Sequence, residues 1–280
     1  MNQNTLRYVP GTSWLYLRFY GGTQALEEWL TGPFSVLLQP WLVAGSVDSF
    51  HYLRYLDPDY HLRIRLKLAD PVKSGEILNS ISSICRPLLE DDLMWKMEAG
   101  TYEPETGRYG INRMDLVEQW FFADSVFWLD WLGGAANEPD NDRWQKCASR
   151  VDWMLNRFAL TLKEKSEILD RMRKALSAEF HVTRSIKNQL DVKYRTLSAE
   201  MEFALKKAVD STEQAPTLTD LGATFPDHET LIRSNLVPDL VHMTLNRALR
   251  TRHRVQELVL YDFLARYYHS AVAREEVNRD

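Results

Sequence analysis

The hydrophobic pattern of this chain changes character once along its length, near residue 113, and this change constrains the fold more than any other feature. Before it, short runs of strand-like alternation are separated by longer amphipathic runs typical of helices. After it, the apolar residues follow helical spacing. The sequence therefore predicts an α+β fold, with an α/β sheet part at 1–112 and a helical part at 113–280. The helices expected in the helical part are 116–132, 144–162, 165–180, 183–209, 229–250 and 254–268.

Four strands are predicted in the sheet part. Two of them, 50–56 and 60–68, are joined by Asp-Pro-Asp at 57–59, a turn sequence because Pro presets φ and Asp bonds nearby backbone. Pro33 and Pro40 are expected to break the first helix. The remaining strands and the two helices are 14–20, 93–102, 26–42 and 72–89. The order strand, helix, strand, strand, helix, strand predicts a ferredoxin-like βαββαβ element in a mixed antiparallel sheet.

The charge balance and the cysteine pattern exclude several classes of protein. The chain has 34 Lys and Arg against 39 Asp and Glu, a net charge of −5, which gives no basis for nucleic-acid binding. Cys85 and Cys147 stand apart rather than in CxxC pairs, which argues against a disulfide scaffold and a structural zinc site. The N-terminus has no signal-peptide core, and the longest apolar run, 34–43, is too short to span a bilayer. We therefore expect a soluble, cytoplasmic protein.

The strand expected at 60–68 contains the alternating run His-Leu-Arg-Ile-Arg-Leu-Lys-Leu. Because strand side chains alternate between faces, its four polar residues are predicted to share one face of the sheet. They are His61, Arg63, Arg65 and Lys67. Two guanidinium groups at the spacing of Arg63 and Arg65 can hold a dicarboxylate, or a carboxylate together with a developing oxyanion. The alternative is a half-exposed sheet whose arginines face water.

Two further runs carry candidate functional residues. In the loop at 101–110, Glu105 is close enough to orient Arg108 through an ion pair, the alternative being a structural turn with a surface salt bridge. His242 and Asn246 are four residues apart on a predicted helix and therefore share a face. A histidine is the natural general acid or base at neutral pH, although a single helical histidine also serves as a structural residue.

Taken together, these runs resemble a known family. The runs that carry the resemblance are 52–58, 61–65, 101–105 with 108–110, Asp124-Ser125, and His242-Met243 with Asn246-Arg247. In this order and spacing they resemble the C-terminal glutamate-elimination domain of lantibiotic dehydratases, also called the thiopeptide-type bacteriocin biosynthesis domain. The resemblance extends from about Trp14 to the last helix, which implies one elimination-type domain over 1–280. One departure is Ile111, where the family usually has a second glycine.

The resemblance implies a lyase that removes glutamate from glutamylated Ser or Thr of a ribosomally made precursor peptide, which gives dehydroalanine or dehydrobutyrine. His242 matches the family histidine and is the expected general acid/base. Arg63 and Arg65 match the family arginine pair and are expected to hold the glutamyl carboxylates and the developing negative charge. Arg108 matches a third catalytic arginine, with Glu105 as its orienting partner.

The resemblance also implies the rest of the site and its partners. Arg54 and Asn246 are weaker candidates for shaping the substrate-binding site, together with Glu105. Because the glutamyl carboxylate leaves readily, no metal and no organic cofactor are expected. The large domain that attaches glutamate from glutamyl-tRNA is missing, so the chain resembles a stand-alone form that needs a separate glutamylating subunit. No contact with nucleic acid or membrane is expected, and a homodimer is compatible with this interpretation.

Two other functions stay open. One is a thiopeptide pyridine synthase, which joins two dehydroalanines in a formal 4+2 cycloaddition and shares this fold with a changed active site. The other is a non-catalytic subunit that binds the precursor peptide and recruits it to a glutamylating partner. The arginine pair, Arg108 and His242 together favour elimination, because a subunit that only binds peptide does not need this ionisable set. Glutamyl-tRNA ligation is disfavoured by the acidic chain.

Overall fold

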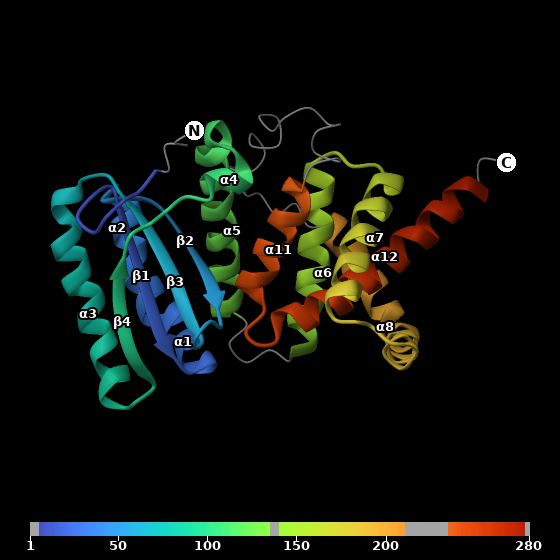
Figure 1. The fold of residues 1–280 in the computed structure, drawn as a ribbon, viewed down its shortest axis with the longest axis horizontal. Helices are drawn as coiled ribbons and strands as arrows, with labels where there is room; N and C mark the ends of the chain where they lie inside the picture. Colours follow the sequence, from blue (N-terminus) through green and yellow to red (C-terminus); the bar gives the residue numbers. More distant parts are fainter. Residues whose placement is uncertain (1–5, 135–139, 211–234, 278–280) are drawn as a thin grey trace. The chain divides into compact units, whose positions relative to one another are not determined.

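The computed structural model describes residues 6–134, 140–210 and 235–277. By their packing, the residues form two compact units, Met1–Asn137 and Glu138–Asp280 (Figure 1). The first unit contains a four-stranded sheet, and the described part of the second is helical. The predicted α+β class is therefore confirmed.

The first unit begins with the sheet and its helices and ends on a long helix. Its elements are β1 (Trp14–Gly21), α1 (Thr23–Trp29), the π-helical turn η1 (Leu30–Phe34), α2 (Ser35–Val43), β2 (Val47–Tyr55), β3 (His61–Leu68), the 3-10 turn η2 (Pro71–Lys73), α3 (Ser74–Glu90), β4 (Met94–Gly100), α4 (Thr106–Tyr109), the 3-10 turn η3 (Ile111–Arg113) and α5 (Met114–Gly134). All four strands overlap the predicted ranges.

The strands are ordered β2-β3-β1-β4, and each neighbouring pair is antiparallel. One face of the two central strands is apolar and fully buried, with Phe19 and Ile64 at 0% exposure. Phe19 packs against Trp29 of α1, with ring centroids 4.6 Å apart. Because this face is covered, polar side chains concentrate on the other face. The ferredoxin-like description of this unit stays a prediction, supported by this strand order.

The predicted helix break at Pro40 is wrong, and at Pro33 a π-helical turn interrupts the regular α-helix in place of a loop. Pro33 lies inside the π-helical turn η1, Pro40 lies inside α2, and α1, η1 and α2 follow one another without an intervening loop. A proline inside a helix costs about 3 kcal/mol through its missing N–H and its ring. Leu30, Phe34 and Leu38 of this segment have 0% exposure, and burying three large apolar side chains offsets that cost.

Helix α5 packs along the edge of the sheet, although the sequence pattern places it in the helical part. The backbone N–H of Tyr52 in β2 donates to Ser125 Oγ of α5 at 3.3 Å. Phe50 and Phe122 meet edge to face, with centroids 5.8 Å apart. Because β2 is one of the two edge strands, α5 covers an edge that otherwise presents unpaired backbone groups. The packing boundary consequently lies later in the chain than the change of pattern near residue 113.

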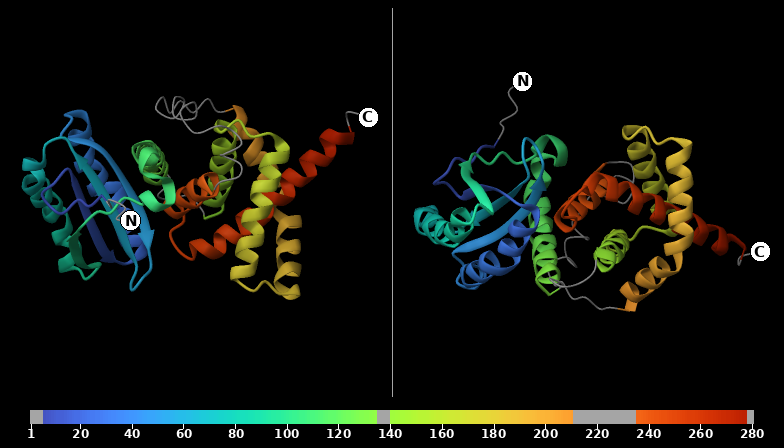
Figure 2. Two further views of the ribbon diagram at one scale, coloured as in Figure 1. Left: turned by 45° about the horizontal axis from the view of Figure 1, so that its top comes forward. Right: turned by 90° about the horizontal axis from the view of Figure 1, so that it is seen from below.

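The described elements of the second unit are α6 (Asp140–Arg157), α7 (Leu162–Glu179), α8 (Arg184–Asp210), α11 (Leu236–Ala248) and α12 (His253–Val277). Helix α12 packs along α7 and also contacts α6 and α8 (Figure 2). A capping box between Thr161 and Glu164 begins α7. The first residues of the helix predicted at 229–250, up to residue 234, lie outside the described residues. Across the three ranges that the structure describes, no helix has the length and apolar character to cross a membrane.

Both cysteines are buried and carry thiols. Burial raises the pKa of the Cys85 thiol to about 12. Since the thiolate is the reactive form, we expect iodoacetamide at about pH 8 to leave both cysteines of the folded protein unmodified. Intact-mass spectrometry tests this expectation, with the same treatment in denaturant as the control in which both react. Alkylation of Cys85 in the native protein would contradict it.

Candidate functional site

The polar face of the sheet is formed by facing residues of β1 and β3. The predicted common face of the four polar residues in β3 is confirmed, because the ladder pairs each with a polar or aromatic residue of β1. The pairs are His61 with Tyr20, Arg63 with Arg18, Arg65 with Tyr16, and Lys67 with Trp14. Positive charge and aromatic rings therefore gather on the two central strands.

Arg65 is buried between two tyrosine rings. Its residue exposure is 8%, and its Cζ lies 4.8 Å from the ring centroid of Tyr16 and 5.0 Å from that of Tyr102. Its Nε is buried and has no hydrogen-bond partner in the described chain. The alternative of an arginine that faces water therefore does not hold for Arg65. A desolvated guanidinium with a free donor interacts strongly with an anion.

Arg63 is held from two sides. Its Nε donates to His61 Nε2 at 2.9 Å, and its Cζ lies 3.4 Å from the ring centroid of Tyr55. Stacking on an aromatic face and one hydrogen bond through Nε fix the plane of the guanidinium. The side chain is partly exposed, so a ligand can approach it.

No described carboxylate forms a direct ion pair with the cations of β3, although the charge of Glu118 acts on Lys67 and Arg65 from a longer distance. Among the described residues, no Asp or Glu oxygen lies within 4.0 Å of the charged groups of Arg63, Arg65 or Lys67. On the neighbouring strand, in contrast, Arg18 lies 3.3 Å from Glu98. A row of cations that forms no direct ion pairs with Asp or Glu is the arrangement expected of an anion-binding surface.

Arg54 lies on the opposite face of the sheet from this row. It pairs with Leu62 in the ladder, its exposure is 1%, and its Nη2 donates to Glu27 Oε2 at 2.7 Å. Its Nη1 donates to Tyr60 Oη at 3.1 Å. Because no part of this side chain reaches the polar face, the structure separates Arg54 from the other predicted site residues of the first unit.

The predicted contact between Glu105 and Arg108 is present. Arg108 Nη1 donates to Glu105 Oε2 at 3.2 Å, and the two side chains are 35% and 38% exposed. Next to them, Tyr109 is buried and packs edge to face against Phe121, with centroids 5.7 Å apart. The following Gly110 has a φ of 85°, which favours glycine. The pair therefore stands on a fixed turn with its guanidinium accessible.

Tyr102 is anchored from the side of α5. Its hydroxyl donates to Glu118 Oε1 at 2.7 Å, and burial raises the pKa of both groups above their ordinary values. The Tyr102 ring is thereby fixed against Arg65. The sequence pattern does not indicate Glu118, because its partner lies 16 residues away in a different segment of the chain.

In the second unit, His242 forms a dyad with Glu257. His242 Nδ1 lies 2.9 Å from Glu257 Oε1, and Glu257 of α12 is fully buried. Because a carboxylate only accepts, Nδ1 carries the proton, and Nε2 of the neutral ring is left as the acceptor. The other oxygen, Oε2, accepts from Arg254 Nη1 at 2.7 Å. The side chain of His242 is 27% exposed, which is the arrangement of an oriented general base.

Asn246 lies one turn after His242 on α11 and is 6% exposed. Their predicted common helix face follows from this spacing. Glu257 was missed in the sequence because it lies 15 residues after His242 on a different helix. The predicted site residues therefore fall into two groups, one in each unit.

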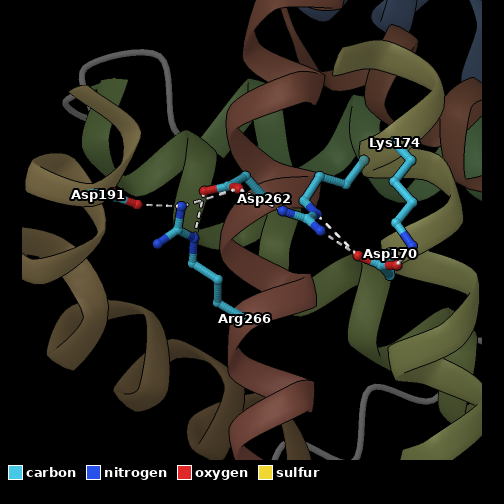
Figure 3. Close-up of polar contacts among 6 residues, drawn as sticks. Asp170, Lys174, Asp191, Asp262 and Arg266 are labelled. Carbon is cyan, nitrogen blue, oxygen red and sulfur yellow. Dashed lines mark hydrogen bonds and ion pairs between the residues drawn. The ribbon is translucent and has the colours of Figure 1, made fainter. Parts of the chain in front are cut away.

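The second unit also contains a charged network that fixes three helices (Figure 3). Arg266 bridges Asp262 of its own helix, at 2.8 Å, and Asp191 of α8, at 2.7 Å. Arg173 of α7 lies 3.7 Å from the buried Asp262. The two arginines line a pocket of about 490 Å³, but aspartates already neutralise them. This pattern is the opposite of the one on β3 and indicates a structural role.

Within the described parts of the chain, no group of three or more His, Cys, Asp or Glu side chains is placed to hold a metal ion. The arginines and aromatic rings of the first unit can bind an anion and stabilise developing negative charge. The histidine and carboxylate of the second unit can transfer a proton.

Comparison with known proteins finds several proteins that are similar to this chain. In Lactococcus lactis subsp. lactis, the nisin biosynthesis protein NisB is 30% identical over 118 residues, which are 42% of this chain and 11% of NisB. Over 96% of the chain, the fold is similar to the tRNA-dependent lantibiotic dehydratase MibB from Microbispora sp. 107891, with a TM-score of 0.68, 18% identity and 29% of MibB covered. The chain thus spans only a small part of either protein.

Two smaller solved proteins share the fold along nearly their whole length. TsrL superposes with a TM-score of 0.64 and 13% identity over 95% of both chains. TbtD, a pyridine synthase from thiomuracin biosynthesis, superposes with a TM-score of 0.59 and 11% identity over 92% of this chain and 99% of its own. The model of the lantibiotic biosynthesis dehydratase C-terminal family matches residues 14–268. The chain therefore belongs to the family of lantibiotic biosynthesis dehydratase C-terminal domains.

Proposed function

We propose that this chain is a lyase that eliminates glutamate from glutamylated Ser or Thr residues of a ribosomally made precursor peptide. The observation that carries the proposal is the row of cations on β3, none of which forms a direct ion pair with a carboxylate of the described residues. A glutamyl ester brings a free carboxylate in the ground state and releases a second one as the ester bond breaks. Two neighbouring arginines match this pair of charges.

The proposed reaction is a β-elimination. A base removes the proton from Cα of the modified residue, the electron pair forms the Cα–Cβ double bond, and the Cβ–O bond breaks. Glutamate leaves as its carboxylate, and the peptide keeps dehydroalanine or dehydrobutyrine. No metal or organic cofactor is required for this balance of atoms and electrons.

We assign His242 as the general acid/base and Glu257 as the group that orients its ring and stabilises the imidazolium. Arg63 and Arg65 bind the glutamyl carboxylates and the developing charge, with Arg108 as a third cation oriented by Glu105. Asn246 stays a candidate for shaping the substrate site.

We give Arg54 a structural role, because its side chain is fully buried and ion-paired with Glu27. The two units together act as one elimination domain in this proposal. The proposed partners are the glutamylated precursor peptide and a glutamylating subunit that uses glutamyl-tRNA, without direct contact of this chain with the tRNA.

A pool of synthetic peptides tests the proposal. Each N-acetylated peptide carries one serine esterified by the α-carboxyl of glutamate, with random flanking residues. We expect the protein to release glutamate and leave dehydroalanine, as followed by mass spectrometry of the pool. Release of glutamate with regeneration of serine would indicate ester hydrolysis and contradict the proposal, and so would the absence of dehydroalanine in the whole pool.

Replacement of Arg65 by glutamine is expected to lower kcat/KM for the pool roughly 10- to 100-fold, because a charge-assisted hydrogen bond contributes about 1.5–3 kcal/mol. The matched control is Arg86→Gln, since Arg86 is exposed on α3, and its kcat/KM is expected to stay at the wild-type value. An unchanged kcat/KM in Arg65→Gln would show that Arg65 does not belong to the proposed site.

Pyridine synthesis is the second candidate, favoured by the superposition on TbtD over 99% of that chain. Peptides that carry two dehydroalanines distinguish the two functions. Formation of a six-membered ring from these peptides, without elimination from the glutamylated pool, would assign the chain to cycloaddition. If it did neither but bound the glutamylated peptides tightly, the chain would be a recruiting subunit.

A further inference from the structure

His61 lies beside Arg63 at the start of β3 and is 1% exposed. Its Nδ1 lies 2.8 Å from the carbonyl oxygen of Asp59, and its Nε2 lies 2.9 Å from Arg63 Nε. Since an arginine Nε only donates and a carbonyl only accepts, one tautomer satisfies both contacts. In that tautomer Nδ1 carries the proton and Nε2 accepts from Arg63. The ring is therefore neutral while both bonds exist.

Aromatic contacts fix the same ring in its plane. His61 stacks on Tyr20, with centroids 4.6 Å apart and an interplanar angle of 28°, and on Tyr55, at 5.8 Å and 30°. Tyr55 in turn supports the guanidinium of Arg63 at 3.4 Å. Histidine and arginine thus share one aromatic support, and the hydrogen bond between them sets the rotation of the guanidinium.

The charges around His61 agree with a neutral ring. Burial lowers the pKa of His61, and the positive charges of Arg63 and Arg18 lower it further. The hydrogen bond to Asp59 and the carboxylate of Glu98 act in the other direction, but the balance is a lowered pKa. A neutral acceptor therefore faces Arg63 at neutral pH.

Arg63 uses only Nε in this contact. Within the described chain, no hydrogen bond or ion pair engages its two Nη groups. With Nε committed to His61, the Nη edge of the guanidinium is the part left for a ligand. That edge can bind a carboxylate through two parallel N–H groups.

We propose that His61 is a positioning residue that holds the Arg63 guanidinium with its Nη edge presented to a carboxylate of the glutamyl substrate. This role rests on the proposed elimination function. In this role His61 accepts the hydrogen bond from Arg63 Nε. Neither the burial of His61 nor its aromatic stacking alone requires such an acceptor.

Two substitutions separate the hydrogen bond from the stacking. His61→Phe keeps an aromatic ring between Tyr20 and Tyr55 but has no acceptor for Arg63. His61→Gln loses the ring, but its amide can accept from Arg63 and donate to Asp59. We expect kcat/KM for the glutamylated peptide pool to fall roughly 10- to 100-fold in His61→Phe, mostly through KM, because a small misplacement of a binding group has an effect of this size. We expect His61→Gln to recover most of the loss.

A second measurement does not depend on activity. In the nuclear magnetic resonance spectrum of the wild-type protein, the Arg63 Nε–H is expected to give a signal protected from solvent exchange, assigned by its loss in Arg63→Lys. The signal should persist in His61→Gln and disappear in His61→Phe. Circular dichroism and thermal unfolding establish that each variant is folded, and His269→Phe, at an exposed histidine of α12, serves as the matched control.

The outcomes separate this role from the function on which it rests. If the wild type eliminates glutamate but His61→Phe matches its kcat/KM, or if the Arg63 signal is unprotected in the wild type, the positioning role is overturned and the elimination function stands. If the wild type yields no dehydroalanine, the proposed function fails, and the positioning role for glutamyl substrates fails with it.

Discussion

Replacement of His242 by alanine is expected to lower the rate of glutamate elimination by roughly 10²- to 10⁴-fold, the usual contribution of a general acid or base. The ring is bonded through Nδ1 to the fully buried Glu257, so its Nε2 is the atom available for the proton of Cα. Because this proposal assigns substrate binding to the arginines and proton transfer to His242, the loss is expected in kcat rather than in KM.

Glu257→Gln tests the dyad more finely. The amide oxygen can still accept from Nδ1, but the amide nitrogen then faces the Arg254 donor, and the charge that stabilises the imidazolium is lost. We expect a decrease of roughly 10²- to 10⁴-fold in kcat, because replacing the carboxylate that orients a catalytic histidine by its amide lowers kcat by up to about 10⁴-fold. Dehydroalanine formation is followed by mass spectrometry, and His269→Ala provides the control at an exposed histidine. A wild-type kcat in His242→Ala would exclude this histidine as the base.

Replacement of Arg54 by methionine is expected to destabilise the first unit by about 3–5 kcal/mol, because it leaves the carboxylate of Glu27 buried without its cation. The Arg54 side chain is 0% exposed and that of Glu27 is 9% exposed, so solvent does not compensate for the loss. Urea denaturation with hydrogen-exchange mass spectrometry of peptides from β2 and α1 measures the change in the free energy of unfolding.

Two controls accompany this substitution. The double variant Glu27→Leu with Arg54→Met removes both charges and is expected to recover most of the stability. Arg108→Met breaks the half-exposed pair with Glu105 and is expected to change stability by less than about 1 kcal/mol. If Arg54→Met keeps its stability but loses elimination, Arg54 belongs to the substrate site after all.

The polar face of the sheet was predictable because polar and apolar residues alternate along β3. Because side chains of a strand alternate with a period of two, Arg63 and Arg65 lie on one face of β3, independently of the rest of the fold. The contact of Glu105 with Arg108 was predictable for the same reason, since it spans three residues. Short-range geometry thus accounts for the part of the site in which sequence and structure agree.

The remaining features depend on contacts between distant segments. The side to which Arg54 points follows from the ladder that pairs it with Leu62, and the sequence pattern alone did not give that register. Glu118 contacts Tyr102 and Glu257 contacts His242, each from a different segment of the chain. Neither glutamate lies in a sequence motif. The continuous path from α1 through α2 depends on packing that outweighs the local cost of two prolines.

The position of α5 along β2 has a consequence for work with the sheet unit as a separate fragment. A fragment that ends near residue 112 would expose the full length of an outermost strand whose backbone N–H at Tyr52 is normally bonded to Ser125. Such an exposed strand edge is a template for pairing between molecules, so this fragment would self-associate or precipitate. A fragment extended to Gly134 retains its own protection against aggregation.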